Sequence, residues 1–174
     1  MMFIADTDIS LRIAEPGDGE QIYRWENDRS LWRVSETSAP TSLFQIEQFL
    51  ISNSDWIANR QLRLMVEVEG ASHPIGSVDL FDYDPVNRRI GIGVLIESAY
   101  RQQGYARRAV QLTLNYLFQD LRVHQVHCLI ADGNLPSLRL FEGLGFLCGG
   151  IRKDWIDTPE GYLDVHFFQK LAND

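Results

Sequence analysis

The chain has 174 residues, of which 45% are hydrophobic and 23% charged, and its formal net charge is -8 at pH 7. These values predict one compact domain over residues 1–174, with no apolar run long enough to cross a membrane. The excess of acidic residues argues against nucleic acid as a partner, because a phosphate backbone requires clustered Lys and Arg. A cationic substrate is compatible with this charge.

The first half of the chain predicts one strand and two helices. Residues 1–6 lack the basic region and apolar core of a secretory signal, so a cytoplasmic protein is expected. A strand is predicted over residues 9–14, and a helix opens after residues 16–18. A second helix is predicted after Thr41 and Ser42, a favourable N-cap pair, because the apolar residues beyond it recur at helical spacing.

The second half predicts further strands and a long helix. The strands are expected at residues 61–69, 75–83, 88–96, 123–131, 146–156 and 162–171. The helix is expected over residues 104–120, where apolar and polar residues fall on opposite sides. Its apolar stripe consists of Ala106, Ala109, Val110, Leu114 and Leu117, and its polar side of Arg107, Gln111, Asn115 and Gln119.

The turn between the strand at 88–96 and this helix has the composition of a phosphate-binding turn. It reads Arg101, Gln102, Gln103, Gly104, Tyr105 and Ala106. Backbone N–H groups converge at a helix N-terminus, where the helix dipole favours an anion. Gly104 lets the backbone approach a phosphate oxygen, and Arg101 can add a charge-assisted contact. Taken alone, the six residues also fit an ordinary strand-to-helix turn.

A second motif follows the strand at 123–131. It consists of Asn134-x-x-Ser137 and then Leu140-Phe141-Glu142-x-x-Gly145-Phe146. Together with the preceding Arg-x-x-Gly-x-Ala turn, it resembles the GNAT superfamily of acyl-CoA-dependent N-acetyltransferases, most closely the spermidine/diamine and ribosomal-protein branches. The resemblance covers residues 75–171. It implies an α/β (α+β) GNAT fold, a mixed and mostly antiparallel sheet of about six or seven strands, splayed in the middle and flanked by about four helices.

The resemblance also implies acetyl-CoA as co-substrate. The pantetheine arm would meet the backbone of Val94, Leu95 and Ile96, and the pyrophosphate would bind at the turn. The second motif would add cofactor contacts from Asn134, Ser137 and Phe141, although Asn134 is also a favoured helix N-cap. Gly91 and Gly93 fit a bulge or a closely approaching backbone beside this strand, and they also fit a flexible edge strand.

Two positions depart from the family pattern. Phe141 stands where the spermidine branch has a tyrosine acid, and Gly91 stands where a carboxylate often follows the Arg-Arg pair. Strand alternation places Ser77, Asp79, Phe81 and Tyr83 on one face and Asp82 with Asp84 on the other.

These positions supply the predicted catalytic residues. Asp79 is the predicted base, and Tyr83 is predicted to steady the substrate or act as the acid. A solvated Asp and a packed Tyr are the alternative. Trp32 and Glu36 are predicted to line the amine pocket through cation–π and charge attraction.

The predicted function is N-acetyl transfer from acetyl-CoA to a primary amine of a small molecule, with a polyamine such as spermidine as a candidate. The alternatives are acetylation of protein N-termini, as in the ribosomal-protein branch, and a non-catalytic acyl-CoA-binding module. No metal is expected, because His124 and His127 fall on opposite faces of a strand and the two cysteines lack ligand spacing. No membrane partner is expected, and a homo-oligomer is left open.

Overall fold

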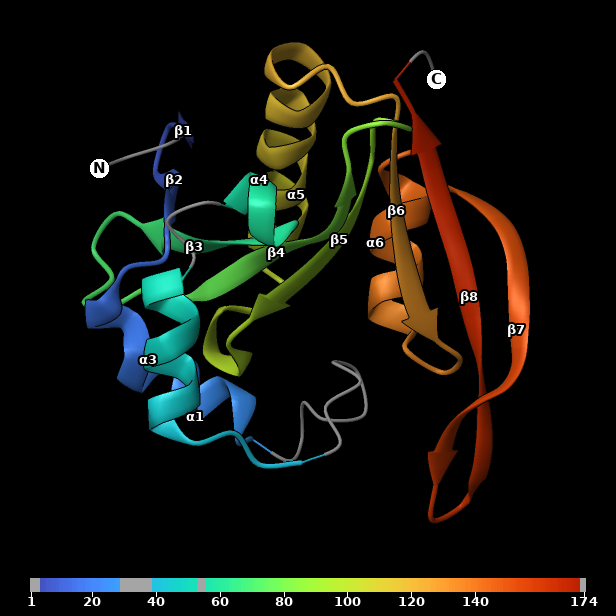
Figure 1. Ribbon diagram of the computed structural model, residues 1–174, viewed down its shortest axis with the longest axis horizontal. Coiled ribbons are helices and arrows are strands. Elements are labelled where there is room, and N and C mark those ends of the chain that lie inside the picture. Colours follow the sequence, from blue (N-terminus) through green and yellow to red (C-terminus); the bar gives the residue numbers. More distant parts are fainter. Residues whose placement is uncertain (1–3, 29–38, 53–55, 173–174) are drawn as a thin grey trace. The chain divides into compact units, whose positions relative to one another are not determined.

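The computed structural model describes residues 4–28, 39–52 and 56–172. Within them, eight strands form one mixed sheet in the order β1-β2-β3-β4-β5-β6-β8-β7 (Figure 1). The β1–β2, β2–β3, β3–β4, β4–β5 and β7–β8 ladders are antiparallel, and the β5–β6 ladder is parallel. This confirms the predicted class of fold. Contacts divide the chain into two compact units, one of residues 1–14, 55–127 and 170–174 and the other of residues 15–54 and 128–169.

The first unit is a sheet with a helix packed on it. Its strands are β1 (Ile4–Asp6), β2 (Ile9–Ile13), β3 (Leu62–Val68), β4 (Gly76–Asp84), β5 (Arg89–Ile96) and the start of β6 (Gln125–Ala131). Helix α4 (Trp56–Asn59) precedes β3, and a 3-10 turn, η2 (Ser98–Tyr100), follows β5. Helix α5 (Tyr105–Asn115) continues into a π-helical turn, η3 (Tyr116–Asp120), and packs against β2, β4 and β5 (Figure 1).

The core of this unit lies between α5 and one face of the sheet. Strand alternation brings to that face a set of side chains that are at most 1% exposed, namely Leu64, Val66, Val78, Leu80, Ile90 and Ile92. The predicted apolar stripe is confirmed for Ala109, Val110, Leu114 and Leu117, which are buried, while Ala106 is half-buried and the predicted polar side is exposed. Truncating one such buried leucine to alanine costs about 2–5 kcal/mol. The opposite sheet face carries the polar residues described below.

The second unit contains a helix pair and a helix beside a hairpin. The elements are η1 (Pro16–Asp18), α1 (Gly19–Glu26), α3 (Leu43–Ser52), the remainder of β6, α6 (Leu135–Gly143), β7 (Leu147–Thr158) and most of β8 (Gly161–Leu171). The predicted start of α3 is confirmed by a reciprocal capping box: the Gln45 N–H donates to Ser42 Oγ at 3.2 Å, and the Ser42 N–H donates to Gln45 Oε1 at 2.8 Å.

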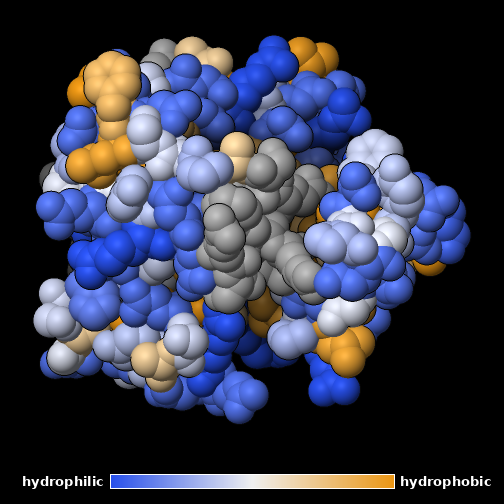
Figure 2. All heavy atoms as spheres, turned by 90° about the horizontal axis from the view of Figure 1, so that it is seen from below, coloured by the Kyte–Doolittle hydropathy of each residue, from blue (hydrophilic) through white to orange (hydrophobic). Residues whose placement is uncertain are grey.

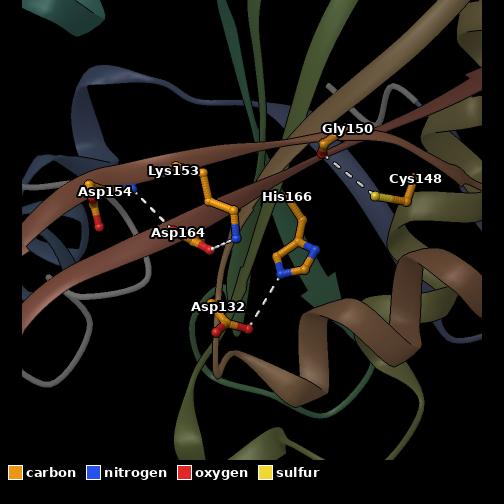
Figure 3. A network of polar contacts seen from close by, with 7 residues as sticks. All are labelled: Asp132, Cys148, Gly150, Lys153, Asp154, Asp164 and His166. Carbon is orange, nitrogen blue, oxygen red and sulfur yellow. Dashed lines mark hydrogen bonds and ion pairs between the residues drawn. The ribbon is translucent and has the colours of Figure 1, made fainter.

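The β7–β8 hairpin contains a bulge stabilised by one carboxylate. Asp164 of β8 accepts hydrogen bonds from Lys153 Nζ at 2.6 Å and from the Asp154 N–H at 3.0 Å (Figure 3). Both donors belong to β7, where the register shifts between Arg152 and Ile156 and Asp154 takes a φ of 49°. The Lys153 hydrogen bond holds the pKa of Asp164 below its usual value. A bulge of this kind bends the outer strand of a sheet and interrupts the edge available for further pairing.

The structure adds two elements that the sequence did not predict, β1 with three residues and α4 with four. Both are shorter than the window over which hydrophobic periodicity can be recognised, so their omission has a simple physical cause. The face of the molecule in Figure 2 is mostly hydrophilic among its coloured atoms, and hydrophobic residues form small separate groups there.

Candidate acyl-CoA site

The predicted phosphate turn is open at the N-terminus of α5. Gly104 is the N-cap residue and has a φ of +85°, a conformation that glycine adopts without strain. A Cβ atom placed on Gly104 would have no atom within 4 Å, so the backbone here is accessible. The first helical hydrogen bond runs from the Arg108 N–H to Gly104 O at 3.1 Å. The first N–H groups of a helix have no intrahelical acceptor, and the predicted phosphate contact at this turn rests on that general property.

The side chain of Arg101 links this turn to the end of β5 by a hydrogen bond. Its Nε donates to Ile96 O at 2.8 Å, which leaves the outer guanidinium nitrogens as the groups that can meet a phosphate. Gln103 Nε2 donates to Ala99 O at 3.0 Å and closes the turn internally. The remaining predicted turn residues, Gln102, Tyr105 and Ala106, lie in the same segment, with Gln102 at a φ of 60°.

The outer edge of β5 offers backbone groups beyond its pairing with β6. The parallel ladder covers three residue pairs and ends with Gly91 opposite His127. Farther along, the Glu97 N–H donates to Ile75 O at 2.9 Å on the β4 side, so alternation directs the amide groups of Ile96 and Val94 away from β4. The Arg101 contact to Ile96 O agrees with this direction. Leu95, between them, has its amide groups on the β4 side.

Asp79 lies on the sheet face opposite to α5. Its Oδ1 accepts from Arg63 Nε at 2.5 Å, and its Oδ2 accepts from Ser77 Oγ at 3.3 Å. The side chains of Arg63 and Asp79 are 17% and 33% exposed. This partly buried pair fixes the carboxylate in place and leaves it accessible to solvent. An accessible carboxylate of this kind can attract a cation.

Phe81 and Gly91 fit together on the same face. They are opposite each other in the β4–β5 ladder, and a Cβ atom on Gly91 would lie 2.2 Å from Phe81 Cε2. The Phe81 ring therefore occupies the space that a side chain at residue 91 would need. On the other side, the ring stacks with His127 at a centroid distance of 6.1 Å. Gly91 is thus explained by packing, which is a reason that the sequence did not reveal.

Strand alternation does not continue to the end of β4. The register shifts between Phe81 and Asp84, where Asp82 has a φ of 51°, and Asp84 pairs with Arg89. Because Arg89 and Gly91 share a face, Asp84 lies on the face of Asp79, and the prediction that it lies on the opposite face is wrong. The bulge adds a residue that the simple period of two does not include. Tyr83 follows the bulge.

Tyr83 packs beside helix α4. Its ring contacts that of Trp56 at a centroid distance of 5.3 Å, and its N–H donates to Arg60 O at 3.0 Å. The side chain is therefore part of a local aromatic contact in the first unit. Its predicted catalytic role stays a prediction.

Three predicted cofactor residues lie in the second unit. Asn134 caps α6, accepting the Ser137 N–H at 3.3 Å, so the predicted capping role of Asn134 is confirmed. Phe141 is 3% exposed and packs edge-to-face on Phe146 at 5.0 Å. Trp32 and Glu36 lie outside the described residues.

The surroundings of the two cysteines do not indicate a catalytic role for either one. Cys128 is buried, and burial raises the pKa of its thiol, which makes it a poor nucleophile. Cys148 is exposed, and its Sγ donates to Gly150 O at 3.6 Å (Figure 3). In the described part of the chain, no group of three or more His, Cys, Asp or Glu side chains is arranged as a metal site. No helix in the described ranges has both the length and the apolar character needed to cross a membrane.

Two residues beside the site were not singled out by sequence reasoning. Arg63 was treated only as part of a strand, and His127 was considered only as a metal ligand. The register of four strands, β3 to β6, brings both of them to the face of Asp79. A search for polar residues at alternate positions of strands adjacent in sequence would have found Arg63. His127 would have been missed, because the strand that pairs with β6 depends on the topology of the sheet.

Comparison with known proteins identifies the family. Residues 8–147 match the family model of the acetyltransferase (GNAT) domain. The chain is 30% identical over 99 residues to the SPbeta prophage-derived uncharacterized N-acetyltransferase YokL of Bacillus subtilis (strain 168), a match that covers 57% of this chain and only 56% of the length of that relative. It is 24% identical over 163 residues to a spermidine N(1)-acetyltransferase of Vibrio cholerae, covering 94% of this chain and 86% of that protein.

The fold comparison agrees. The crystal structure of spermidine N-acetyltransferase from Vibrio cholerae in complex with CoA and spermine has a TM-score of 0.88 and 24% sequence identity, covering 97% of this chain and 98% of that one. Because the family model spans residues 8–147, well over half of the sequence, the chain belongs to the acetyltransferase (GNAT) domain family.

Proposed function

We propose that the protein transfers the acetyl group of acetyl-CoA to a primary amine of a small cationic molecule, with a polyamine such as spermidine as the first candidate. The observation that carries this proposal is the continuity of two features of the first unit. The outer backbone edge of β5, beyond its last pair with β6, leads directly into the accessible Gly104 turn. The β5 edge accepts an extended amide chain, and the Gly104 turn accepts a pyrophosphate. This is the order in which the pantetheine arm and the pyrophosphate follow one another in CoA.

The cofactor contacts follow from this order. The backbone groups of Val94 and Ile96 lie on the side where a further strand would pair, and they suit the amides of pantetheine. The turn from Arg101 to Ala106 would hold the pyrophosphate through backbone N–H groups and one guanidinium. Asn134, Ser137 and Phe141, which belong to the second unit, stay predicted cofactor contacts.

The amine side of the site carries an accessible carboxylate where it is described. The Asp79 carboxylate is accessible on the face opposite to α5, and the chain carries a net charge of -8. Both features favour a protonated amine over an anionic substrate. In the neutral form, the amine attacks the carbonyl carbon directly, and negative charge that develops on the carbonyl oxygen can be met by an outward backbone N–H group of β5. No covalent intermediate on the protein is required.

The experiment has two stages. Calorimetry with acetyl-CoA tests binding, with Gly104→Val as the perturbation, because a side chain there combines backbone strain with obstruction of the turn. Gly17→Val is the control, since a Cβ atom there also has no atom within 4 Å and its φ is not in the left-handed region. We expect wild type and control to bind and the Gly104 variant to bind at least tenfold more weakly.

Turnover is then measured as thiol release against polyamines, monoamines and peptides with free N-termini. Release with polyamines supports the proposal. Release with peptides alone would replace it with acetylation of protein N-termini, an alternative that a putative ribosomal N-acetyltransferase among the relatives keeps in view. Binding without turnover on any amine would indicate a non-catalytic acyl-CoA-binding module.

A further inference from the structure

His127 lies at the point where β5 and β6 cease to pair. It is the last β6 residue of the parallel ladder, opposite Gly91, and its side chain is half-buried. Directly opposite residues place their side chains on the same face of a sheet. The imidazole therefore shares the face of Phe81, which stacks on it, and of Asp79, which lies opposite Gly93. The two glycines of β5 leave this stretch of the face without side chains of their own.

The hydrogen bond of His127 determines which ring nitrogen can accept a proton. Nδ1 lies 3.1 Å from Ile90 O, and a carbonyl oxygen only accepts, so Nδ1 carries the hydrogen. In the neutral imidazole, Nε2 then has the lone pair. A backbone carbonyl thus fixes the tautomer and the ring orientation, as expected for a histidine that takes up a proton through Nε2.

The length of the pantetheine arm brings the reacting atoms to this histidine. The arm has about twelve bonds between the pyrophosphate ester oxygen and the sulfur, equivalent to about four residues of extended chain or roughly 13–14 Å. Its phosphate end is expected at the turn after Ile96. An extended arm that follows β5 backward from Ile96 therefore ends at the level of Ile92, next to Gly91 and its partner His127.

Asp79 and His127 have different environments on this face. The Asp79 carboxylate is held by Arg63 and Ser77, an arrangement that fixes its position and suits attraction of a cationic amine. The register of the neighbouring strands places four charged side chains on the face of His127, namely Arg63, Asp79, Asp84 and Arg89. An imidazole is also better matched than a carboxylate to proton transfer near neutral pH.

We propose that His127, in place of the predicted Asp79, is the catalytic base of the acetyl transfer, with Asp79 holding the amine substrate; this inference rests on the proposed function. The neutral amine forms a bond from nitrogen to the acetyl carbon, and Nε2 of His127 removes a proton from that nitrogen. The carbon–sulfur bond then breaks, and the departing thiolate takes a proton from the imidazolium. The products are the N-acetyl amine and the free thiol of CoA, and His127 returns to its neutral form.

The test compares His127→Asn with His124→Asn. The asparagine amide at residue 127 can still donate to Ile90 O, but it cannot take up a proton. His124 is exposed directly before the same strand and serves as the matched control. We expect His127→Asn to lower kcat about 100- to 10,000-fold while acetyl-CoA binds as tightly as to wild type in calorimetry, and His124→Asn to match wild type in both.

Chemical rescue distinguishes a base from a structural residue. In His127→Gly, added imidazoles should restore turnover, and the rescue rate should rise with the pKa of the added imidazole. A residue that only supports Phe81 would give no such dependence. Independently of activity, nitrogen NMR of the ligand-free protein should show the neutral His127 ring protonated on Nδ1.

The outcomes separate the inference from the function on which it rests. If wild type binds acetyl-CoA and turns over amines but His127→Asn retains full kcat, the base assignment is wrong and the proposed function stands. Protonation on Nε2 in the NMR experiment would likewise overturn the assignment. If wild type shows no turnover on any amine, the proposed function itself fails.

Discussion

Substitution of Gly91 by alanine tests the packing that surrounds the proposed site. The added Cβ would lie 2.2 Å, 2.5 Å and 2.7 Å from three atoms of the Phe81 ring, so the ring must move. Gly93, two residues farther along the same face, is the matched control, because its Cβ would approach Phe81 only to 3.9 Å. The two variants make the same chemical change in the same strand and differ in the room available.

The expected loss of stability in Gly91→Ala follows from overpacking. Forcing an extra methyl group into a filled site costs about 1–3 kcal/mol, and for a chain of this length each kcal/mol lowers Tm by about 2–4 °C. We therefore expect Gly91→Ala to lower Tm by about 2–12 °C. The free energy of unfolding of Gly93→Ala should lie within about 1 kcal/mol of the wild-type value. The substitution can be slightly stabilising, since alanine restricts the unfolded chain.

Thermal unfolding measures the change in Tm. Urea unfolding monitored by fluorescence gives the free energy of unfolding, taken from the midpoint at unchanged slope. A double-mutant cycle identifies the cause. With Phe81→Leu in the background, the Gly91→Ala penalty should shrink, giving a coupling of about 0.5–3 kcal/mol. Equal stability of Gly91→Ala and Gly93→Ala, or a penalty unchanged by Phe81→Leu, would refute the explanation of Gly91 by the Phe81 ring.

Three further predictions concern other parts of the chain. A thiol reagent should modify Cys148 in the native protein and spare Cys128 until unfolding, because the latter is buried and its pKa is raised; rapid modification of both contradicts this. Since the hydrogen bond from Lys153 lowers the pKa of Asp164 from 3.8, its stabilising contribution is present above that pH and is lost on further acidification. Asp164→Asn should therefore flatten the decline of Tm below about pH 4, and an unchanged pH profile counts against the bond. Asn134→Ala should lower the free energy of unfolding by about 1 kcal/mol without CoA present, whereas Asn134→Asp should retain the cap, as measured by urea unfolding.

The local sequence was sufficient for the elements that have a clear period or a clear cap. The amphipathic stripe of α5 predicted a helix packed on a sheet, and burial of Leu114 and Leu117 confirms it. The capping residues Ser42 and Asn134 were recognised for the same reason, since a cap is a contact between residues three apart. Information of this kind lies within a single turn of the chain and does not depend on what packs against it.

Contacts between distant residues could not be predicted from that local information. The ion pair of Arg63 with Asp79, the fit of the Phe81 ring over Gly91 and the stacking of that ring on His127 join separate strands and depend on their register. A single bulge after Phe81 was enough to move Asp84 to the other face. The sequence by itself determined the class of fold, the position of the turn before α5 and the family, because short ordered motifs encode them. Tertiary structure decided which polar groups face one another, because the pairing of strands determines these contacts. No local sequence pattern encodes which strand will be the partner of another.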